Sequence, residues 1–270
     1  MALLSGKVAF ITGAGGGIGR GIAINFAREG ANIVVAEFNP ETGEATAAEL
    51  RGMGVEAKFI ATDIGKLETV KNAIQETVDT FGSIDIVVNN AYPTMKYMPE
   101  DIQAIDDDRM FDSMMAGFHS VTTAMRCAFP HMQAKGWGRF INICSLNGVN
   151  AHKFTADYNS AKEAVRAYTR TAAVEWAPFG ITANMICPAA VTTPFKMLEE
   201  FAPDVVKDAA SGNPMGRMGD PEKDIGGVAL CLASDYMNYV TGNTLFVDGG
   251  SHVNGSPWGA TKPDFGEMGG

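Results

Sequence analysis

The sequence predicts an α/β fold: one doubly wound, mostly parallel sheet of seven strands with helices on both faces. Short, almost continuously apolar runs alternate with longer segments whose apolar residues recur at three- and four-residue spacing. A strand that is apolar along its whole length is buried on both faces, as in a parallel sheet covered by helices. With 270 residues, the chain is long enough to bury one sizeable core.

The elements follow one another in a regular order from the first residues onward. Each predicted strand is a short run rich in Val, Ile, Phe and Ala, and the segment after it has the apolar spacing of an amphipathic helix. The predicted strands are residues 8–11, 33–36, 57–61, 84–88, 140–144, 182–186 and 244–247. The predicted helices are residues 18–29, 41–53, 67–81, 109–133, 158–177 and 221–234. Seven strands in one such series indicate a single domain rather than two.

Two stretches interrupt this alternation. Residues 192–218 are rich in Met, Phe and Pro, and residues 251–270 are rich in Gly and Pro. A long insertion in a compact domain is usually a lid, a binding loop or disorder. We therefore assign residues 1–250 to one domain, interpret 192–218 as its lid segment, and separate 251–270 as a C-terminal tail.

The composition argues against several classes of function. The chain has 31 acidic and 21 basic residues, and its net charge of −10 disfavours binding to the phosphate backbone of nucleic acid. Hydrophobic residues make up 46% of the chain, which excludes intrinsic disorder. We find no targeting signal and no apolar run of membrane-spanning length, and the four cysteines form no disulfide pattern. We expect a cytoplasmic protein with no membrane partner and, because its four histidines are scattered, no metal site.

A glycine-rich turn joins the first predicted strand to the first predicted helix. It contains Gly13, Gly17, Ile18 and Gly19. Glycines at such a place let the backbone approach a pyrophosphate, which the N–H groups and the dipole of the helix N-terminus then hold. The spacing matches neither G-x-G-x-x-G nor the P-loop, and a plain tight turn is the alternative interpretation.

The second predicted strand ends in an acid, Glu37, 18 residues after Gly19. A carboxylate at this place accepts hydrogen bonds from an adenosine ribose and repels a 2′-phosphate. The next residues, Phe38 and Asn39, offer no cation that could neutralise such a phosphate. The pattern predicts a Rossmann-type domain that binds NAD in preference to NADP, the alternative being that Glu37 is a solvated charge at a strand end.

Ser145, Tyr158 and Lys162 are the candidate catalytic residues. Tyr158 and Lys162 lie four residues apart on one face of a predicted helix, and Ser145 lies 13 residues before Tyr158, at the carboxyl end of the fifth strand. Doubly wound folds bind ligands at this edge. A phenol is a poor base at neutral pH, but a neighbouring ammonium group and a cationic nicotinamide ring lower its pKa. A Tyr-x-x-x-Lys pair alone is common; together with the glycine turn and the acid it indicates a catalytic set.

These features resemble the short-chain dehydrogenase/reductase family over about residues 5–250. The matching motifs are Thr12-Gly13-x-x-x-Gly17-x-Gly19, Asp63-Ile64, Asn89-Asn90-Ala91, the Ser145, Tyr158 and Lys162 set, and Val247-Asp248-Gly249-Gly250. The resemblance implies an alcohol/ketone oxidoreductase, commonly a homotetramer, with Tyr158 as the acid/base, Ser145 on the substrate oxygen and Lys162 on the nicotinamide ribose. Beyond the turn and Glu37, the cofactor-binding residues that it implies are Asp63, Ile64, Asn90, Ala91, Tyr158, Lys162, Pro188, Val191 and Thr193.

Three positions depart from the family's pattern. Tyr92 stands where the N-N-A-G element has its glycine, so we expect Tyr92 to shape the substrate pocket. Ala189 replaces the glycine that usually follows the proline, here Pro188. Gly117 stands where a helix asparagine is expected to support the proton relay, so a water molecule or a backbone carbonyl would have to do that work.

We therefore predict NAD-dependent hydride transfer between a secondary alcohol and a ketone, without a metal. The lid segment and the segment after the fourth strand carry many apolar side chains, which favour a bulky cyclic or aryl substrate over short hydroxy acids or polyols. They are Met95, Tyr97, Met98, Phe195, Met197, Leu198, Phe201, Met215 and Met218. The candidate substrate-binding residues are Tyr92, Asn147, His152 and Met197. Three alternatives stay open: the apolar residues only pack the lid and subunit contacts, the enzyme works as an NADH-dependent ketone reductase, or the chain is an NAD-binding regulator that has lost catalysis.

Overall fold

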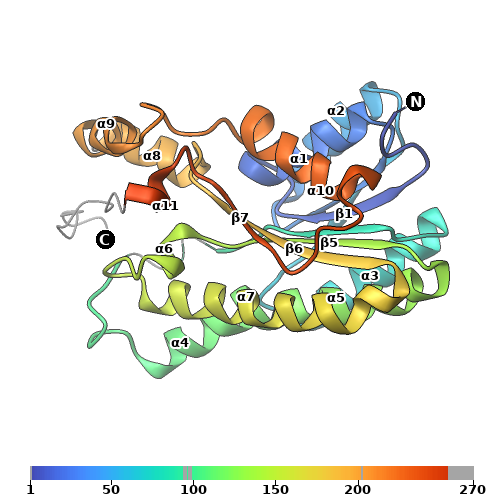
Figure 1. Ribbon diagram of the computed structural model, residues 1–270, viewed down its shortest axis with the longest axis horizontal. Coiled ribbons are helices and arrows are strands. Elements are labelled where there is room, and N and C mark those ends of the chain that lie inside the picture. Colours follow the sequence, from blue (N-terminus) through green and yellow to red (C-terminus); the bar gives the residue numbers. More distant parts are fainter. Residues whose placement is uncertain (1, 94–95, 97–98, 202, 255–270) are drawn as a thin grey trace.

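A seven-stranded sheet forms the centre of the molecule in the computed structural model of the chain (Figure 1). The structure describes residues 2–93, 96, 99–201 and 203–254. The strands lie in the order β3-β2-β1-β4-β5-β6-β7, and each pairing of neighbours is parallel. They are β1 (Val8–Thr12), β2 (Asn32–Glu37), β3 (Ala57–Ala61), β4 (Ile86–Asn89), β5 (Gly138–Ile143), β6 (Ile181–Pro188) and β7 (Thr244–Val247). The predicted strands are confirmed, and this sheet is wholly rather than mostly parallel.

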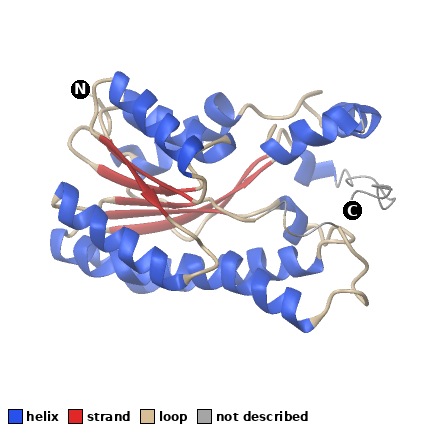
Figure 2. Cartoon of the chain, turned by 180° about the vertical axis from the view of Figure 1, so that it is seen from behind, coloured by secondary structure: helices blue, strands red, loops and turns tan. Residues whose placement is uncertain are grey.

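Helices cover both faces of the sheet, as Figure 1 shows and Figure 2 shows from behind. One face carries α1 (Gly17–Arg28), α2 (Pro40–Gly52) and α10 (Gly227–Ala233), and the other carries α3 (Leu67–Phe81), α5 (Ser120–Lys135) and α7 (Ala156–Trp176). Successive strand residues point to opposite faces. In β1, Ile11 therefore belongs to the core under α1 and Phe10 to the core under α5. This two-sided burial explains why the strands read as continuous apolar runs.

Local signals fix the ends of the helices that follow the strands. Asn39 caps α2, since its side-chain oxygen accepts the Glu41 N–H at 2.9 Å, and Pro40 takes the first helical position. Asp106 caps α4 (Asp107–Met114) in the same way by accepting the Arg109 N–H at 2.8 Å. These caps set where the loops at the carboxyl edge of the sheet end.

Two of the predicted helices contain π turns, which the apolar spacing did not predict. The predicted helix 109–133 consists of α4, a π turn (Met115–His119) and α5 in succession. The predicted helix 221–234 is a π turn (Pro221–Gly226) followed by α10. A π turn takes i→i+5 hydrogen bonds and is frequent at functional sites. The first of these turns contains Gly117.

The lid segment is helical. It folds into α8 (Thr193–Phe201) and α9 (Pro203–Gly212), which lie beyond the carboxyl ends of the strands, on the same side of the molecule as the short α6 (Leu146–Val149) (Figure 1). The tail starts with α11 (Ser251–Asn254), and residues 255–270 lie outside the described part of the chain. The elements at this edge therefore surround the place where the sequence predicts the ligand.

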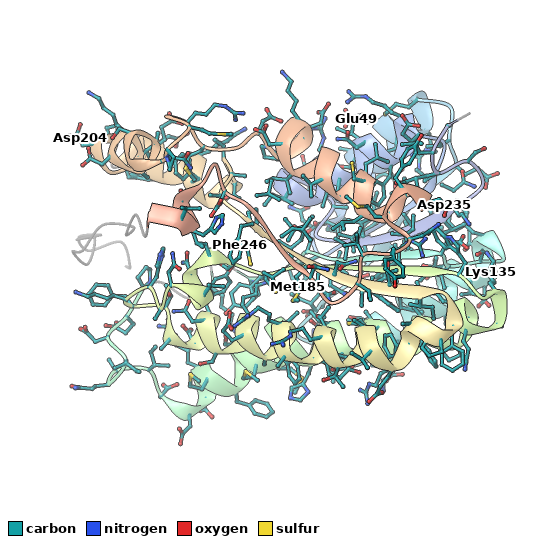
Figure 3. The ribbon with its side chains drawn as sticks, in the orientation of Figure 1. Glu49, Lys135, Met185, Asp204, Asp235 and Phe246 are labelled. Atoms are coloured by element: carbon teal, nitrogen blue, oxygen red, sulfur yellow. The ribbon has the colours of Figure 1, made fainter. Side chains whose placement is uncertain are left out.

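A buried acid and its lysine partner hold the opposite edge of the sheet. Asp85 is fully buried, accepts the Val8 N–H at 2.9 Å, and pairs with Lys135 at the end of α5. Figure 3 shows Lys135 and Asp235 at the end of the molecule opposite Asp204 of α9. These charges stabilise the fold far from the candidate site. Among the described residues, no helix has both the length and the apolar character that a membrane span requires.

Candidate active site

The glycine-rich turn folds tightly between β1 and α1. Gly13 has φ of 66°, a left-handed conformation that favours glycine. A Cβ on Gly19 would lie 2.3 Å from the Gly13 carbonyl oxygen, so the strand and the helix can come this close only without a side chain. The N-cap residue of α1, Gly16, has no side chain with which to cap the first N–H groups of the helix. The turn thus presents backbone donors and a helix dipole to an anion.

Asn90 and Ala91 hold this turn from the neighbouring strand. The side-chain amide of Asn90 donates to the Thr12 carbonyl at 2.9 Å and the Gly13 carbonyl at 3.2 Å. The Thr12 hydroxyl in return accepts the N–H groups of Asn90 at 2.9 Å and Ala91 at 3.1 Å. This network joins the ends of β1 and β4, where the strand order of the sheet reverses and doubly wound folds bind dinucleotides. The sequence did not single out Thr12 as the residue that joins them.

Glu37 lies beside the turn at the end of β2. Its carboxylate accepts the N–H groups of Gly15 at 3.0 Å, Phe38 at 2.9 Å and Asn39 at 3.1 Å, which fixes its orientation. The other acid of the predicted cofactor set, Asp63, follows β3 at the same edge and accepts the Gly65 N–H at 3.0 Å. Uncapped helix donors beside an oriented acid match the phosphates and the ribose of a dinucleotide. The residues present therefore fit a nicotinamide dinucleotide.

The structure brings Ser145, Tyr158 and Lys162 together. Ser145 follows β5 and caps α6, where its Oγ accepts the Asn147 N–H at 3.1 Å, and its side chain lies close enough to the Tyr158 phenol to lower the pKa of that phenol. On α7, the Lys162 Nζ lies 5.7 Å from the centre of the Tyr158 ring. The same Nζ donates to the Ile143 carbonyl at 2.8 Å, a contact that the sequence gave no signal for. The arrangement places a serine hydroxyl and a cation on either side of one phenol.

Burial dominates the electrostatics of this phenol. Burial raises the pKa of Tyr158 to about 12, and the Ser145 side chain opposes that rise. The sequence predicts that the Lys162 ammonium lowers the phenol pKa; in the structure the largest influence on this pKa is desolvation, which raises it. Burial also lowers the pKa of Lys162, whose side chain is enclosed between β5 and α7. A cation beside the phenol is needed to bring its pKa back toward neutrality.

Tyr92 and Gly117 meet beside the catalytic residues. A Cβ on Gly117 would lie 2.9 Å from Cε2 of Tyr92 and 2.8 Å from Cβ of Ala161. The Tyr92 ring packs edge-on against the Tyr158 ring, with 4.7 Å between ring centres and 77° between planes. Tyr92 therefore lies beside Tyr158, and its role in shaping the substrate pocket stays a prediction; its neighbours Met95, Tyr97 and Met98 lie outside the described residues.

Two of the candidate substrate-binding residues lie in α6 and in the loop that follows it, Asn147 in the helix and His152 in the loop. The Asn147 carbonyl accepts the His152 N–H at 2.9 Å, which closes the loop on itself. Both ring nitrogens of His152 are buried and have no hydrogen-bond partner among the described residues, and burial lowers the pKa of this imidazole. Ala151 and Phe154, on either side, have φ of 50° and 67°, which costs conformational energy in residues with side chains. A cavity of about 550 Å³ adjoins His152, but Ser145, Tyr158 and Lys162 do not line it.

The lid segment packs partly on itself. Phe195 and Met218 are buried in a small core with Ala189 and Val206, whereas Phe201 and Met215 are exposed. Of the predicted cofactor residues, Pro188 ends β6, and the N–H of Val191 donates to the Gly219 carbonyl at 2.9 Å. Thr193 and Met197 lie in α8, but their side chains are outside what the structure describes. The lid residues with described side chains thus divide between packing the lid and facing solvent.

Comparisons with known proteins agree with this geometry. The family model described as enoyl-(acyl carrier protein) reductase matches residues 13–252. The chain is 34% identical to a 12α-hydroxysteroid dehydrogenase of Clostridium sp., over 93% of this chain and 98% of that protein. It is 35% identical to an L-fucose dehydrogenase of Oryctolagus cuniculus, over 95% of this chain and 88% of that protein. The crystal structure of levodione reductase superposes with a TM-score of 0.86 at 26% identity, covering 93% of this chain and 99% of that one.

Proposed function

The chain belongs to the short-chain dehydrogenase/reductase family, an oxidoreductase family that uses nicotinamide cofactors, and we propose that it interconverts a secondary alcohol and a ketone with NAD. One observation carries the proposal. The Tyr158 phenol lies beside the Ser145 side chain and Lys162, at the edge of the sheet where the glycine turn and Glu37 fit a dinucleotide. The reacting oxygen of a substrate and a proton-transfer group can meet there.

Three side chains of this site have separate roles in the proposed reaction. In the direction of oxidation the Tyr158 phenolate accepts the hydroxyl proton of the substrate. The Ser145 hydroxyl donates a hydrogen bond to the same oxygen and stabilises the charge that develops on it. The positive charge of Lys162 favours the phenolate over the phenol. The bound nicotinamide ring supplies the hydride acceptor. In the direction of reduction the phenol gives the proton back.

The preference for NAD over NADP rests on Glu37. Its carboxylate is held in place by three backbone N–H groups beside the turn, so it cannot easily rotate away from a ribose 2′-phosphate. Repulsion between the two anions disfavours NADP. We therefore expect the wild-type protein to prefer NAD by at least ~10-fold in kcat/KM, which corresponds to about 1.4 kcal/mol.

A bulky, largely apolar ring alcohol is the proposed substrate class. The Tyr92 and Tyr158 rings form an aromatic surface beside the reacting phenol, and Met and Phe side chains are frequent in the lid segment. The hydroxysteroid relative acts on a substrate of this class, as its name states, and the fucose relative marks sugars as the competing class.

A substrate screen tests these proposals. Purified protein is mixed with NAD or NADP and with secondary alcohols that include hydroxysteroids, aryl alcohols, short hydroxy acids, polyols and sugars, and NADH formation is followed by absorbance. We expect ring alcohols to exceed polyols and hydroxy acids by ~10²-fold or more in kcat/KM. A highest kcat/KM with polyols would refute the substrate class. Tight NAD binding without turnover in either direction would identify the chain as a regulator instead.

A further inference from the structure

We propose that Tyr92 is a positioning residue, which holds the Tyr158 ring in place and shields Tyr158 and Lys162 from water, and that Gly117 provides the space it needs. This inference rests on the proposed function, because it concerns the residues that transfer the proton. Three features of the structure support it: the absent side chain of Gly117, the anchor of Tyr92 on Ser113, and the contact between two aromatic rings.

The first feature is the space beside Gly117. This residue lies in the π turn Met115–His119, where the helix passes close to Ala161 of α7. Any Cβ at this position would come within 2.8 Å of the Ala161 Cβ and within 2.9 Å of the Tyr92 ring, distances that real Cβ atoms essentially never show. The Tyr92 ring and a side chain at position 117 therefore exclude each other.

The second feature is the anchor that keeps the Tyr92 ring in that space. The Tyr92 hydroxyl is hydrogen-bonded to the Ser113 Oγ at 2.7 Å, and Ser113 is fully buried in α4, immediately before the π turn. A buried hydroxyl without a partner would cost free energy, so this bond favours one position of the ring. One helical segment thus fixes both parts of the Tyr92 side chain: Ser113 holds the hydroxyl, and the ring lies against Gly117.

The third feature is what the ring covers. Its edge-on contact with Tyr158, at 4.7 Å between centres, is a favourable aromatic geometry. The Lys162 Nζ lies 5.5 Å from the centre of the Tyr92 ring, almost as close as to that of Tyr158. The other polar or titratable groups that face Tyr158 are Ser145 and Cys144 after β5 and Cys187 on β6. The Tyr92 ring thus covers one side of Tyr158, whose other named neighbours are polar or titratable side chains.

Removal of this cover has a predictable sign. Desolvation is the largest cause that raises the pKa of Tyr158. In Tyr92→Ala, water reaches the phenol, so its pKa falls, and the limb of the pH profile that this phenol governs, rising for oxidation and falling for reduction, moves to lower pH. The ring also loses its support, and we expect kcat/KM to fall ~10- to 100-fold because small displacements of reacting groups are costly. The KM for NAD is expected to change less than kcat/KM for the alcohol, since the contacts that the structure gives for the Tyr92 side chain are with Ser113, Gly117, Tyr158 and Lys162.

The test compares four variants with the wild type by pH profiles of kcat/KM and by thermal unfolding. Tyr92→Ala removes the ring and Gly117→Ala displaces it, and both should move the limb governed by Tyr158 in the same direction. Tyr92→Phe restores the ring without its hydroxyl and should return the limb toward the wild-type position. Phe111→Ala removes an exposed aromatic side chain from the same helix, α4, and serves as the matched control. In the Tyr92→Ala background, Gly117→Ala should reduce kcat/KM clearly less than it does in the wild type.

A second readout separates this inference from the proposed function. The 13Cζ resonance of Tyr158, assigned by its loss in Tyr158→Phe, reports the phenol titration without turnover. A lower midpoint in Tyr92→Ala than in the wild type supports the shielding role even if no substrate is turned over. An equal midpoint, an unchanged pH profile in a folded Tyr92→Ala, or additive effects of Tyr92→Ala and Gly117→Ala would overturn it. A wild-type protein that turns over no alcohol or ketone would instead refute the proposed function.

Discussion

Burial raises the pKa of the Tyr158 phenol and so disfavours its anion, although the substrate proton must be transferred to that anion during oxidation. Tyr158→Phe removes the proton-transfer group but keeps the ring. We expect the rate to fall by ~10²–10⁴ while NADH affinity, measured by fluorescence titration, is retained. Tyr168→Phe, the same change on the same helix, is the control. A Tyr158→Phe rate within about threefold of wild type would refute the assignment.

Lys162 is the cation that we expect to lower the Tyr158 pKa against the effect of burial. Oxidation needs the phenolate, so its rate should rise with pH toward the Tyr158 pKa, whereas reduction needs the phenol and should fall over the same range. Lys162→Met removes a positive charge near the phenol, which raises the phenol pKa and moves both limbs to higher pH.

The pH dependence of kcat/KM in both directions measures this shift, and its sign is opposite to that expected for Tyr92→Ala. Lys71→Met, at an exposed lysine of α3 paired with Glu68, should leave the profile unchanged. An unchanged profile in Lys162→Met would make Lys162 a structural residue.

Glu37 is the residue on which the cofactor preference depends. Glu37→Ala removes the charge that repels a 2′-phosphate, so we expect the ratio of kcat/KM for NAD over NADP to fall toward one. Glu41→Ala, an exposed acid in the first turn of α2, should leave the ratio unchanged. Equal use of both cofactors by the wild type would contradict the proposal.

At the scale of elements, the turn between β1 and α1 depends on close backbone approach. Gly19→Ala places a Cβ 2.3 Å from the Gly13 carbonyl oxygen, and neither backbone can move without disturbing the Asn90 network. We expect a loss of ~1–3 kcal/mol in stability, the usual cost of overpacking, together with weaker NAD binding.

A second glycine gives the control for that variant. A Cβ on Gly52, the last residue of α2, would meet nothing within 4 Å, so Gly52→Ala should be neutral or stabilise by ~0.4–1 kcal/mol. Thermal unfolding and NADH titration of both variants decide the matter. Equal stability and equal NADH affinity of Gly19→Ala and Gly52→Ala would show that the turn tolerates a side chain.

The pattern of apolar residues predicted the strands and helices because each element is buried on a regular side. Its failures lie where helical geometry departs from that regularity. The π turns at Met115–His119 and Pro221–Gly226 keep the helices continuous, so the three- and four-residue spacing hardly changes. In the lid segment, α8 and α9 do carry apolar residues at helical spacing, but from its sequence the segment is interpreted as an insertion because it interrupts the alternation of strands and helices; their described side chains help to bury a small separate core.

At the scale of the whole molecule, the resemblance to the family implies a homotetramer, which stays a prediction. The outer surface near the end of α7 exposes apolar side chains, with Val174 76% and Phe179 38% exposed. Val174→Asp should therefore shift the assembly to smaller species in size-exclusion chromatography with light scattering. Val253→Asp, at a position 78% exposed on α11, is the matched control. A monomeric wild type would contradict the prediction.

The sequence by itself determined the order and type of the elements, the glycine turn with its acid, and the identity of Ser145, Tyr158 and Lys162. These depend on local spacing, and local spacing is visible in a linear chain. Only the tertiary structure decided that Tyr92 fills the space beside Gly117, that Lys162 is held by the Ile143 carbonyl, and that burial is the largest influence on the Tyr158 pKa. Those properties arise from contacts between segments far apart in the chain, and desolvation depends on everything packed around a group rather than on its neighbours in sequence.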